Sequence, residues 1–196
     1  WRLLYYPESA PGQQEISIHY ADALRAADHQ IVFRETVHGV AIQHGLKASF
    51  LPKILADKAG NGCHLHLSLW QNGQNITGNG SGQLSSTAKN FIGGIIHHLP
   101  ALMALTTPCT NSYRRIRPHF WSGAFSTWGY DNREGAVRVP SNPLPPSPTH
   151  FELKTVDASA NPYLALGAVI FAGLDGVNRN LNPGEAVDID PGLFTP

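Results

Sequence analysis

The sequence predicts an α+β fold in which a curved antiparallel β-sheet has helices packed on its outer face. Two segments alternate apolar and polar residues, as strands with one buried face do; they are residues 14–20 and 63–70. Three longer segments carry apolar residues at helical spacing; they are residues 21–46, 86–105 and 161–178. Because the alternating segments are polar on one side, we expect functional side chains on the concave face, opposite the helices.

Turn and strand signals predict the remaining elements along the chain. Short strands are expected where apolar runs stand between turn residues, at 1–6, 48–51, 121–130, 136–139 and 150–154. Asn72-Gly73 predicts a tight hairpin turn after the strand at 63–70. Loops are expected where Gly, Pro, Asn and Ser are concentrated, at 7–12, 57–62, 77–82, 140–148 and 181–196. Gly93-Gly94, within an apolar helix, predicts close packing against another helix.

Length and composition indicate one compact domain, or a large piece of one. The chain has 196 residues, of which 42% are hydrophobic, and 14 basic residues balance 14 acidic ones. A net charge of zero argues against a protein that binds nucleic acid through its phosphates. No apolar run approaches the length of a membrane span, and two cysteines make no disulfide framework, so we expect a cytoplasmic protein. The chain opens without Met on a strand-like segment, and we expect it to be a fragment.

Two pairs of side chains have the character of metal ligands. His64 and His66 lie two residues apart on a predicted strand, so both imidazoles face one side, where they could bind a metal or a phosphate. Glu8 and Glu15 flank a Pro/Gly turn, and carboxylates suit Mg²⁺ or Mn²⁺. The ordinary alternatives are a solvated strand face for the histidines and surface charge for the glutamates.

A concentration of arginines predicts an anion site. In a chain with few charges, five arginines stand within 25 residues; they are Arg114, Arg115, Arg117, Arg133 and Arg138. Guanidinium groups match carboxylate and phosphate oxygens in a bidentate way. A basic surface strip, or ion pairs with Asp131 and Glu134, is the alternative. Glu152 and Lys154 share one face of a short strand and are further candidates for a functional role. The ordinary alternative for this pair is an exposed ion pair, which contributes little.

Together these are the residue types that ATP-dependent activation of a carboxylate requires. Metal ions neutralise the phosphates of ATP, and arginines stabilise the phosphoryl group during transfer. The sequence contains no Gly-x-x-x-x-Gly-Lys-Ser/Thr phosphate loop, no Gly-x-Ser-x-Gly elbow and no Cys-x-x-Cys pair.

Five ordered motifs resemble the catalytic domain of glutamine synthetases. They occupy residues 11–15 (PGQQE), 60–69 (GNGCHLHLSL), 110–115 (TNSYRR), 131–133 (DNR) and 161–176, which begins NPYLA and ends AGLDG. The resemblance covers nearly the whole chain and implies that residues 1–196 form part of that catalytic domain. The resemblance implies that the family's N-terminal β-grasp domain and C-terminal helices lie outside these residues. Because family active sites form between subunits of a ring-shaped homo-oligomer, we expect the chain alone to be inactive.

The resemblance implies a reaction and a role for each matching residue. ATP phosphorylates the γ-carboxylate of glutamate, and ammonia or an organic amine then displaces phosphate to form an amide. Two divalent ions, Mg²⁺ or Mn²⁺, would be bound, one by Glu8 and Glu15 and the other by His64 and Glu152. The nucleotide would be contacted by Tyr20, His66, Ser68 and Arg138. Glutamate would be held by Gly60, Arg115 and Lys154, and Arg133 would act on the transferred phosphate.

Two departures from the family pattern bear on the substrate. Trp121 stands where the family has the glutamate that takes a proton from ammonium, and an indole has no base for that step. Lys154 stands where the family has an arginine, so a compact ammonium replaces a planar guanidinium that can bind in a bidentate way. The leading expectation is therefore a glutamate–amine ligase that uses an organic amine, with Trp121 shaping the amine pocket. The alternatives are an ordinary glutamine synthetase that uses ammonia and a non-catalytic scaffold or sensor.

Overall fold

The computed structural model of the chain describes residues 3–8, 10–141 and 147–193. In that part the strands are β1 (Leu3–Pro7), β2 (Gln14–Ile18), β3 (Leu65–Leu67), β4 (Trp70–Gln71), β5 (Gln74–Asn75), β6 (Phe125–Tyr130), β7 (Gly135–Val139) and β8 (Phe151–Leu153). The helices are α1 (Ala23–Gln43), α2 (Ser86–Thr106), α3 (Thr110–Arg115), α4 (Pro162–Arg179) and a 3₁₀ turn, η1 (Pro191–Leu193).

The central sheet has the strand order β3-β8-β7-β6. The sequence predicts an antiparallel sheet, but this one is mixed. The β3–β8 and β8–β7 pairs are antiparallel, whereas β6 and β7 run parallel. Gly135 pairs with Phe125, so residues 131–134 return the chain to the start of β6 before β7 begins. Asn132 holds this return, because its Oδ1 accepts hydrogen bonds from the backbone N–H groups of Glu134 and Gly135. The predicted α+β class is confirmed, and the direction of one strand is corrected.

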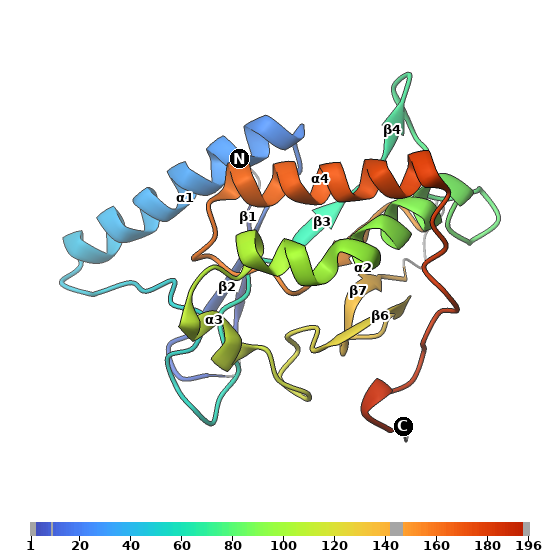
Figure 1. Cartoon of the computed structure of the whole chain (residues 1–196). Helices are drawn as coiled ribbons and strands as arrows, with labels where there is room; N and C mark the ends of the chain where they lie inside the picture. Colours follow the sequence, from blue (N-terminus) through green and yellow to red (C-terminus); the bar gives the residue numbers. More distant parts are fainter. Residues whose placement is uncertain (1–2, 9, 142–146, 194–196) are drawn as a thin grey trace.

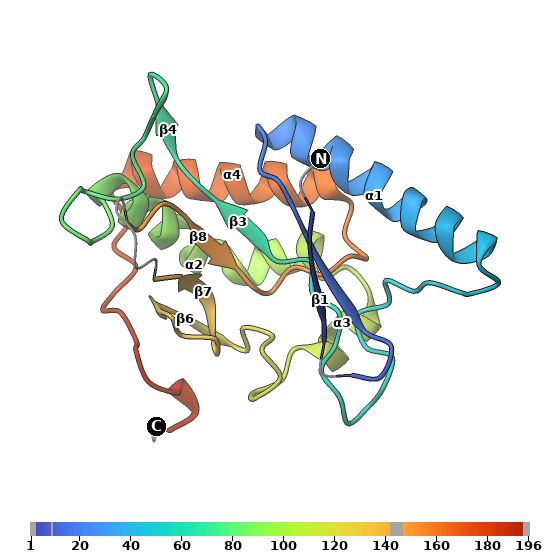
Figure 2. The same cartoon turned by 180° about the vertical axis from the view of Figure 1, so that it is seen from behind.

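Two long helices cover one face of this sheet. In Figure 1, α2 and α4 lie side by side, and in Figure 2 the strands β3, β8, β7 and β6 follow one another in front of α2. Buried residues of both helices and of β7 and β8 form the core; they include Ile92, Ile95, Val169, Val137 and Leu153. A Cβ atom added to Gly94 would lie 2.0 Å from the carbonyl oxygen of Ala172. The close helix packing predicted from Gly93-Gly94 is therefore confirmed.

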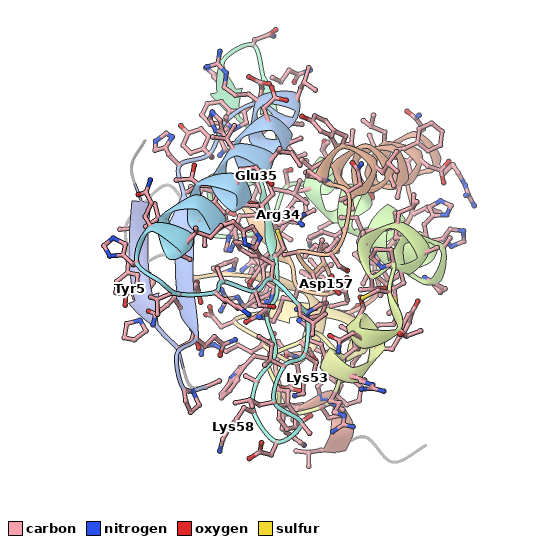
Figure 3. The ribbon with its side chains drawn as sticks, turned by 90° about the vertical axis from the view of Figure 1, so that its left-hand side faces the viewer. Tyr5, Arg34, Glu35, Lys53, Lys58 and Asp157 are labelled. Carbon is pink, nitrogen blue, oxygen red and sulfur yellow. The ribbon has the colours of Figure 1, made fainter. Side chains whose placement is uncertain are left out.

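Helix α1 and the β1–β2 hairpin stand apart from this core. Asp22 caps α1 by accepting a hydrogen bond from the N–H of Arg25, and Ala27 is the one described α1 residue that is buried. The Tyr163 hydroxyl donates to Asp28 at 2.7 Å and ties α4 to α1. In Figure 3, α1 crosses the molecule with Arg34 and Glu35, while Tyr5 marks the outer strand of the hairpin. The apolar stripe of α1 is largely exposed in the chain as described.

Several predicted elements differ from the structure in type or extent. Residues 48–51 form no strand, because Phe50 packs against the rings of Phe33 and His38 on α1 instead of pairing with a sheet. The predicted strand at 63–70 contains only the short β3 and the first residue of β4. The turn at Asn72-Gly73 does form, with positive φ at both residues. Helix α3 and η1 were not predicted.

Other boundaries follow from local geometry. The strand predicted from residue 121 begins at Phe125, because His119, Trp121 and Gly123 all have positive φ and break the extended conformation. Residues 1–2 of the first predicted strand, and residues 142–146 of the proline-rich loop, lie outside the described part.

Candidate active site on the open face of the sheet

Glu152 is the centre of the open sheet face. Its neighbours in β8, Phe151 and Leu153, point into the helix-covered core, so Glu152 points the opposite way. The strand register places it between His66 on β3 and Arg138 on β7. One row of side chains across three strands therefore brings together His66, Arg138 and Glu152, which stand 14 to 86 positions apart in the sequence.

Four basic side chains surround the buried carboxylate of Glu152, which is 2% exposed. Its Oε1 lies 2.8 Å from Nδ1 of His64, 3.6 Å from Nζ of Lys154 and 3.8 Å from Nε2 of His66. Its Oε2 lies 2.7 Å from Nε of Arg138. The exposed ion pair that sequence reasoning kept as the alternative for Glu152 and Lys154 is thus replaced by a buried cluster, which we call the Glu152 cluster.

The charges of this cluster follow from burial and pairing. Burial alone would raise the pKa of Glu152, but the hydrogen bond from His64 and the nearby His64, Lys154 and Arg138 groups lower that pKa overall, so it is ionised. Burial lowers the pKa of His64 to about 4, against the opposing effect of Glu152. Burial also lowers the pKa of Lys154, while Glu152 opposes the change. A neutral imidazole therefore donates to a carboxylate that Arg138 and Lys154 stabilise.

Arg115 lies beneath His64 and is 2% exposed. Its guanidinium donates to the backbone carbonyls of Thr155 and Lys154 at 2.8 and 2.7 Å, and Nη2 lies 3.2 Å from Nε2 of His64. Burial lowers the pKa of Arg115 to about 10. A neutral His64 that donates through Nδ1 accepts through Nε2, so Arg115 and Glu152 fix its ring from both sides. A metal bound to His64 would replace one of these contacts.

The loop before β3 packs tightly on this pair. A Cβ atom at Gly62 would lie 2.4 Å from Nε2 of His64 and 2.8 Å from Nη2 of Arg115. Gln13, at the turn of the β1–β2 hairpin, donates to the carbonyl of Gly60 at 3.0 Å and to Oδ1 of Asn61 at 2.8 Å. The hairpin, the Gly60 loop and the Glu152 cluster therefore form one connected arrangement.

Glu8 and Glu15 meet on the hairpin, as their sequence pairing predicts. Desolvation raises the pKa of Glu15, and so do the hydrogen bond with Glu8 and the charges of Glu8 and Glu152. Carboxylates gathered in this way repel one another, and a divalent cation would offset that repulsion, so the donor chemistry suits Mg²⁺ or Mn²⁺. Among the described residues, however, no three His, Cys, Asp or Glu side chains are arranged to hold a metal ion. The pairs Glu8–Glu15 and His64–Glu152 are formed; a complete ligand set is not.

An aromatic platform stands beside the sheet. The exposed ring of Tyr20 stacks on Trp70 with centroids 6.4 Å apart and on His19 with centroids 4.7 Å apart. Nε1 of Trp70 donates to Oγ of Ser68 at 2.9 Å. The structure therefore joins Tyr20 and Ser68, two of the expected nucleotide contacts, through a tryptophan. Flat exposed rings of this kind can stack on a base.

The segment 116–123, which we call the Trp121 loop, is held in a specific shape. Ser122 Oγ accepts from the N–H of Arg117 at 2.9 Å and donates to its carbonyl at 2.8 Å. The backbone of Trp121 is strained, with φ of 54°. The residue is 47% exposed, so its indole is accessible to solvent. Arg133 is also exposed, on the return between β6 and β7.

The chain is similar in sequence and in structure to known proteins. The family model described as "Glutamine synthetase, catalytic domain" matches residues 4–196. The chain is 41% identical over 196 residues to the gamma-glutamylpolyamine synthetase GlnA3 of Streptomyces coelicolor, covering 98% of this chain and 42% of that protein. It is 43% identical over 181 residues to a glutamine synthetase of Thermococcus kodakarensis, covering 92% of this chain and 40% of that one.

The chain belongs to the glutamine synthetase family. The family resemblance inferred from the five motifs is therefore confirmed, and the homologues are ligases. Among solved structures, a GmaS/ADP complex superimposes with a TM-score of 0.86 at 41% identity, covering 97% of this chain and 45% of that one. An apo GmaS structure superimposes with a TM-score of 0.82, covering 95% and 43%. The chain spans less than half the length of these relatives.

Two further residues contact the site residues: Trp70, which is hydrogen-bonded to Ser68, and His150, whose ring lies beside that of His66. Trp70 faces the same side as His64, His66 and Ser68, and that shared facing was the available sequence signal. His150 lies two residues before Glu152, and its ring centroid is 5.1 Å from that of His66. Its strand parity could have indicated it.

None of the described helices combines the length and apolar character needed to cross a bilayer.

Proposed function

We propose that the whole protein containing this chain is an ATP-dependent ligase that joins the γ-carboxylate of glutamate to an organic amine. The observation that carries the proposal is the exposed indole of Trp121, at the position where the family resemblance expects a proton-accepting glutamate. The gamma-glutamylpolyamine synthetase among its relatives supports an amine acceptor. Trp121 would contact the alkyl part or the ammonium of the acceptor through its ring face.

The Glu152 cluster supplies the anion-binding part of the proposed site. Arg138 and Lys154 are held in place by Glu152, so their charges are positioned before substrate arrives. Arg133 remains exposed and available to the phosphate in transfer. We assign glutamate binding to Gly60, Arg115 and Lys154, with Arg115 acting from beneath the surface because its guanidinium is buried among protein groups. The proposed catalytic residues are Arg133, Arg115, Lys154 and Trp121.

The proposed cofactors are ATP and Mg²⁺ or Mn²⁺. Glu8 and Glu15 would hold one metal ion and His64 and Glu152 a second, and the two ions would neutralise charge on the phosphates of ATP. Tyr20 would stack on the base, and Ser68, His66 and Arg138 would contact the rest of the nucleotide. A ring-shaped homo-oligomer in the cytoplasm, in which the β-grasp domain of a neighbouring subunit completes each site, is part of the same proposal.

The decisive experiment measures phosphate release from ATP by the whole protein with Mg²⁺ and glutamate. Ammonium is added in one series, and alkylamines, polyamines and amino alcohols in others. Release with an organic amine but not with ammonium is expected. Trp121→Glu should raise the response to ammonium, because it restores a proton acceptor.

The second candidate is an ordinary glutamine synthetase, favoured by relatives of that activity at 43% identity. Release with ammonium alone would establish it and overturn our account of Trp121. A protein that shows no release and no thermal shift with ATP would instead be the non-catalytic scaffold.

A further inference from the structure

A hollow of about 290 Å³ lies between the segment after α1 and the Trp121 loop. Its lining residues are Lys53, Ile54, Ala56, Arg114 and Arg117. Three of these five carry a positive charge. Figure 3 shows Lys53 and Lys58 near each other on the loop that forms one wall.

Lys53 is an unusual wall residue because it is only 6% exposed. Asn111 clamps its backbone by accepting from its N–H at 2.6 Å and donating to its carbonyl at 3.0 Å. Its Nζ donates to the carbonyl of Lys58 and lies 4.2 Å from the ring centre of Phe120. Burial and the charge of Arg117 lower its pKa. The ammonium is therefore fixed in position and partly desolvated.

No described acidic group forms an ion pair with these three cations. Asp57, whose charge raises the pKa of Lys53, pairs with Lys58 instead, at 3.5 Å. Gathering cations around a partly desolvated ammonium costs free energy, and a cation–π contact offsets only part of it. A bound anion would supply the missing compensation.

The hollow is distinct from the Glu152 cluster. Arg115, between two of the lining arginines, points toward β8 and His64, where its donors contact Thr155 and Lys154. Arg114 and Arg117 instead line the hollow. We propose that this hollow is a second anion site that binds a small carboxylate or phosphate group.

The hollow adjoins the proposed amine pocket, so an anion bound there would affect the amine acceptor; this link rests on the proposed function. Phe120, against Lys53, directly precedes Trp121, and Arg117 is hydrogen-bonded to Ser122. The anion is either part of an acidic amine acceptor or a separate effector that sets the position of the Trp121 loop.

Calorimetric titration of the whole protein with inorganic phosphate and with succinate, at constant ionic strength, tests the site without turnover. Arg117→Gln should weaken binding about tenfold, because it removes one charged hydrogen-bonding group. Arg25→Gln, an exposed arginine on α1, is the matched control and should change binding less than twofold. Lys53→Met, checked for folding by circular dichroism, should weaken binding at least as much as Arg117→Gln.

Selenate in crystals of the whole protein should give an anomalous peak between Lys53, Arg114 and Arg117. Unchanged binding by Arg117→Gln, or no binding of either anion to the wild type, would overturn the proposal. In turnover assays, phosphate or succinate that raises the KM for the amine alone indicates an acidic acceptor. A change in kcat indicates an effector. Because the titration requires no ligase activity, failure of the proposed function would leave its result intact.

Discussion

The Glu152 cluster and the Trp121 loop meet where Gly123 packs on Lys154, but they are built in opposite ways. Glu152 and Lys154 are buried, and strand pairing places them beside Arg138 and His66. Trp121 is exposed, and its loop is shaped by the hydrogen bonds between Ser122 and Arg117 and by the one that the N–H of His119 donates to Glu134. A change in the cluster leaves a buried charge without its partners, whereas a change at Trp121 leaves the core untouched. Under the proposed function, the phosphate-handling part is constrained and the acceptor-binding part is free to vary.

The largest expected effect comes from Glu152→Gln, which leaves Arg138 and Lys154 without their carboxylate. The free energy of unfolding should fall by about 3–5 kcal/mol, as is typical when one partner of a buried ion pair is removed. Urea denaturation measures it. Glu185→Gln, at an exposed position, is the matched control and should change stability by less than about 0.5 kcal/mol. Equal effects for the two variants would contradict the contrast.

A pH series sharpens the account of His64. Its pKa is about 4 in the folded protein and about 6.5 in the unfolded chain, so the unfolded chain binds the extra proton between these values. His64 therefore contributes stability that is complete above about pH 6.5 and is lost as the pH falls toward 4, by up to about 3 kcal/mol.

The wild type and His64→Asn, both unfolded in urea with chelator present, separate this contribution from those of other groups. The difference between their unfolding free energies should shrink as the pH falls from 6.5 to 4. A difference that stays constant with pH would mean that the pKa of His64 is not lowered in the folded protein.

Gly62→Ala probes the support beneath the cluster. The added Cβ would approach His64 and Arg115 within 2.4 and 2.8 Å, and both side chains would have to move. The expected cost is about 1–3 kcal/mol in the free energy of unfolding. Gly39→Ala is the control, since a Cβ there meets nothing within 4 Å and alanine favours its helix. A Gly62 variant as stable as the Gly39 variant would show that the loop can yield.

The smallest expected effect belongs to Trp121→Ala. The side chain is half exposed, so its removal should change the free energy of unfolding by less than about 1 kcal/mol. Trp128→Ala is the comparison, because Trp128 is 4% exposed and donates to the carbonyl of Gly184. That variant should lose about 3–5 kcal/mol. Thermal or urea unfolding distinguishes them, and a costly Trp121→Ala would place the loop in the folded core.

Much of the site was predictable because strand parity and motif order are local properties. Alternation put His64 and His66 on one side of their segment, and helical spacing located α2 and α4 closely. The five motifs identified the family, which the comparisons confirmed. Helix α3 was missed because its polar six residues carry no apolar stripe.

The sequence by itself determined the class of the fold, the family and the facing of the polar residues, because periodicity is read along one segment at a time. Tertiary structure alone decided that Glu152 is buried among four basic groups, that Arg115 braces His64, and that β6 runs parallel to β7. These features depend on the register between strands and on loops that join distant parts of the chain. Neither is encoded in local spacing.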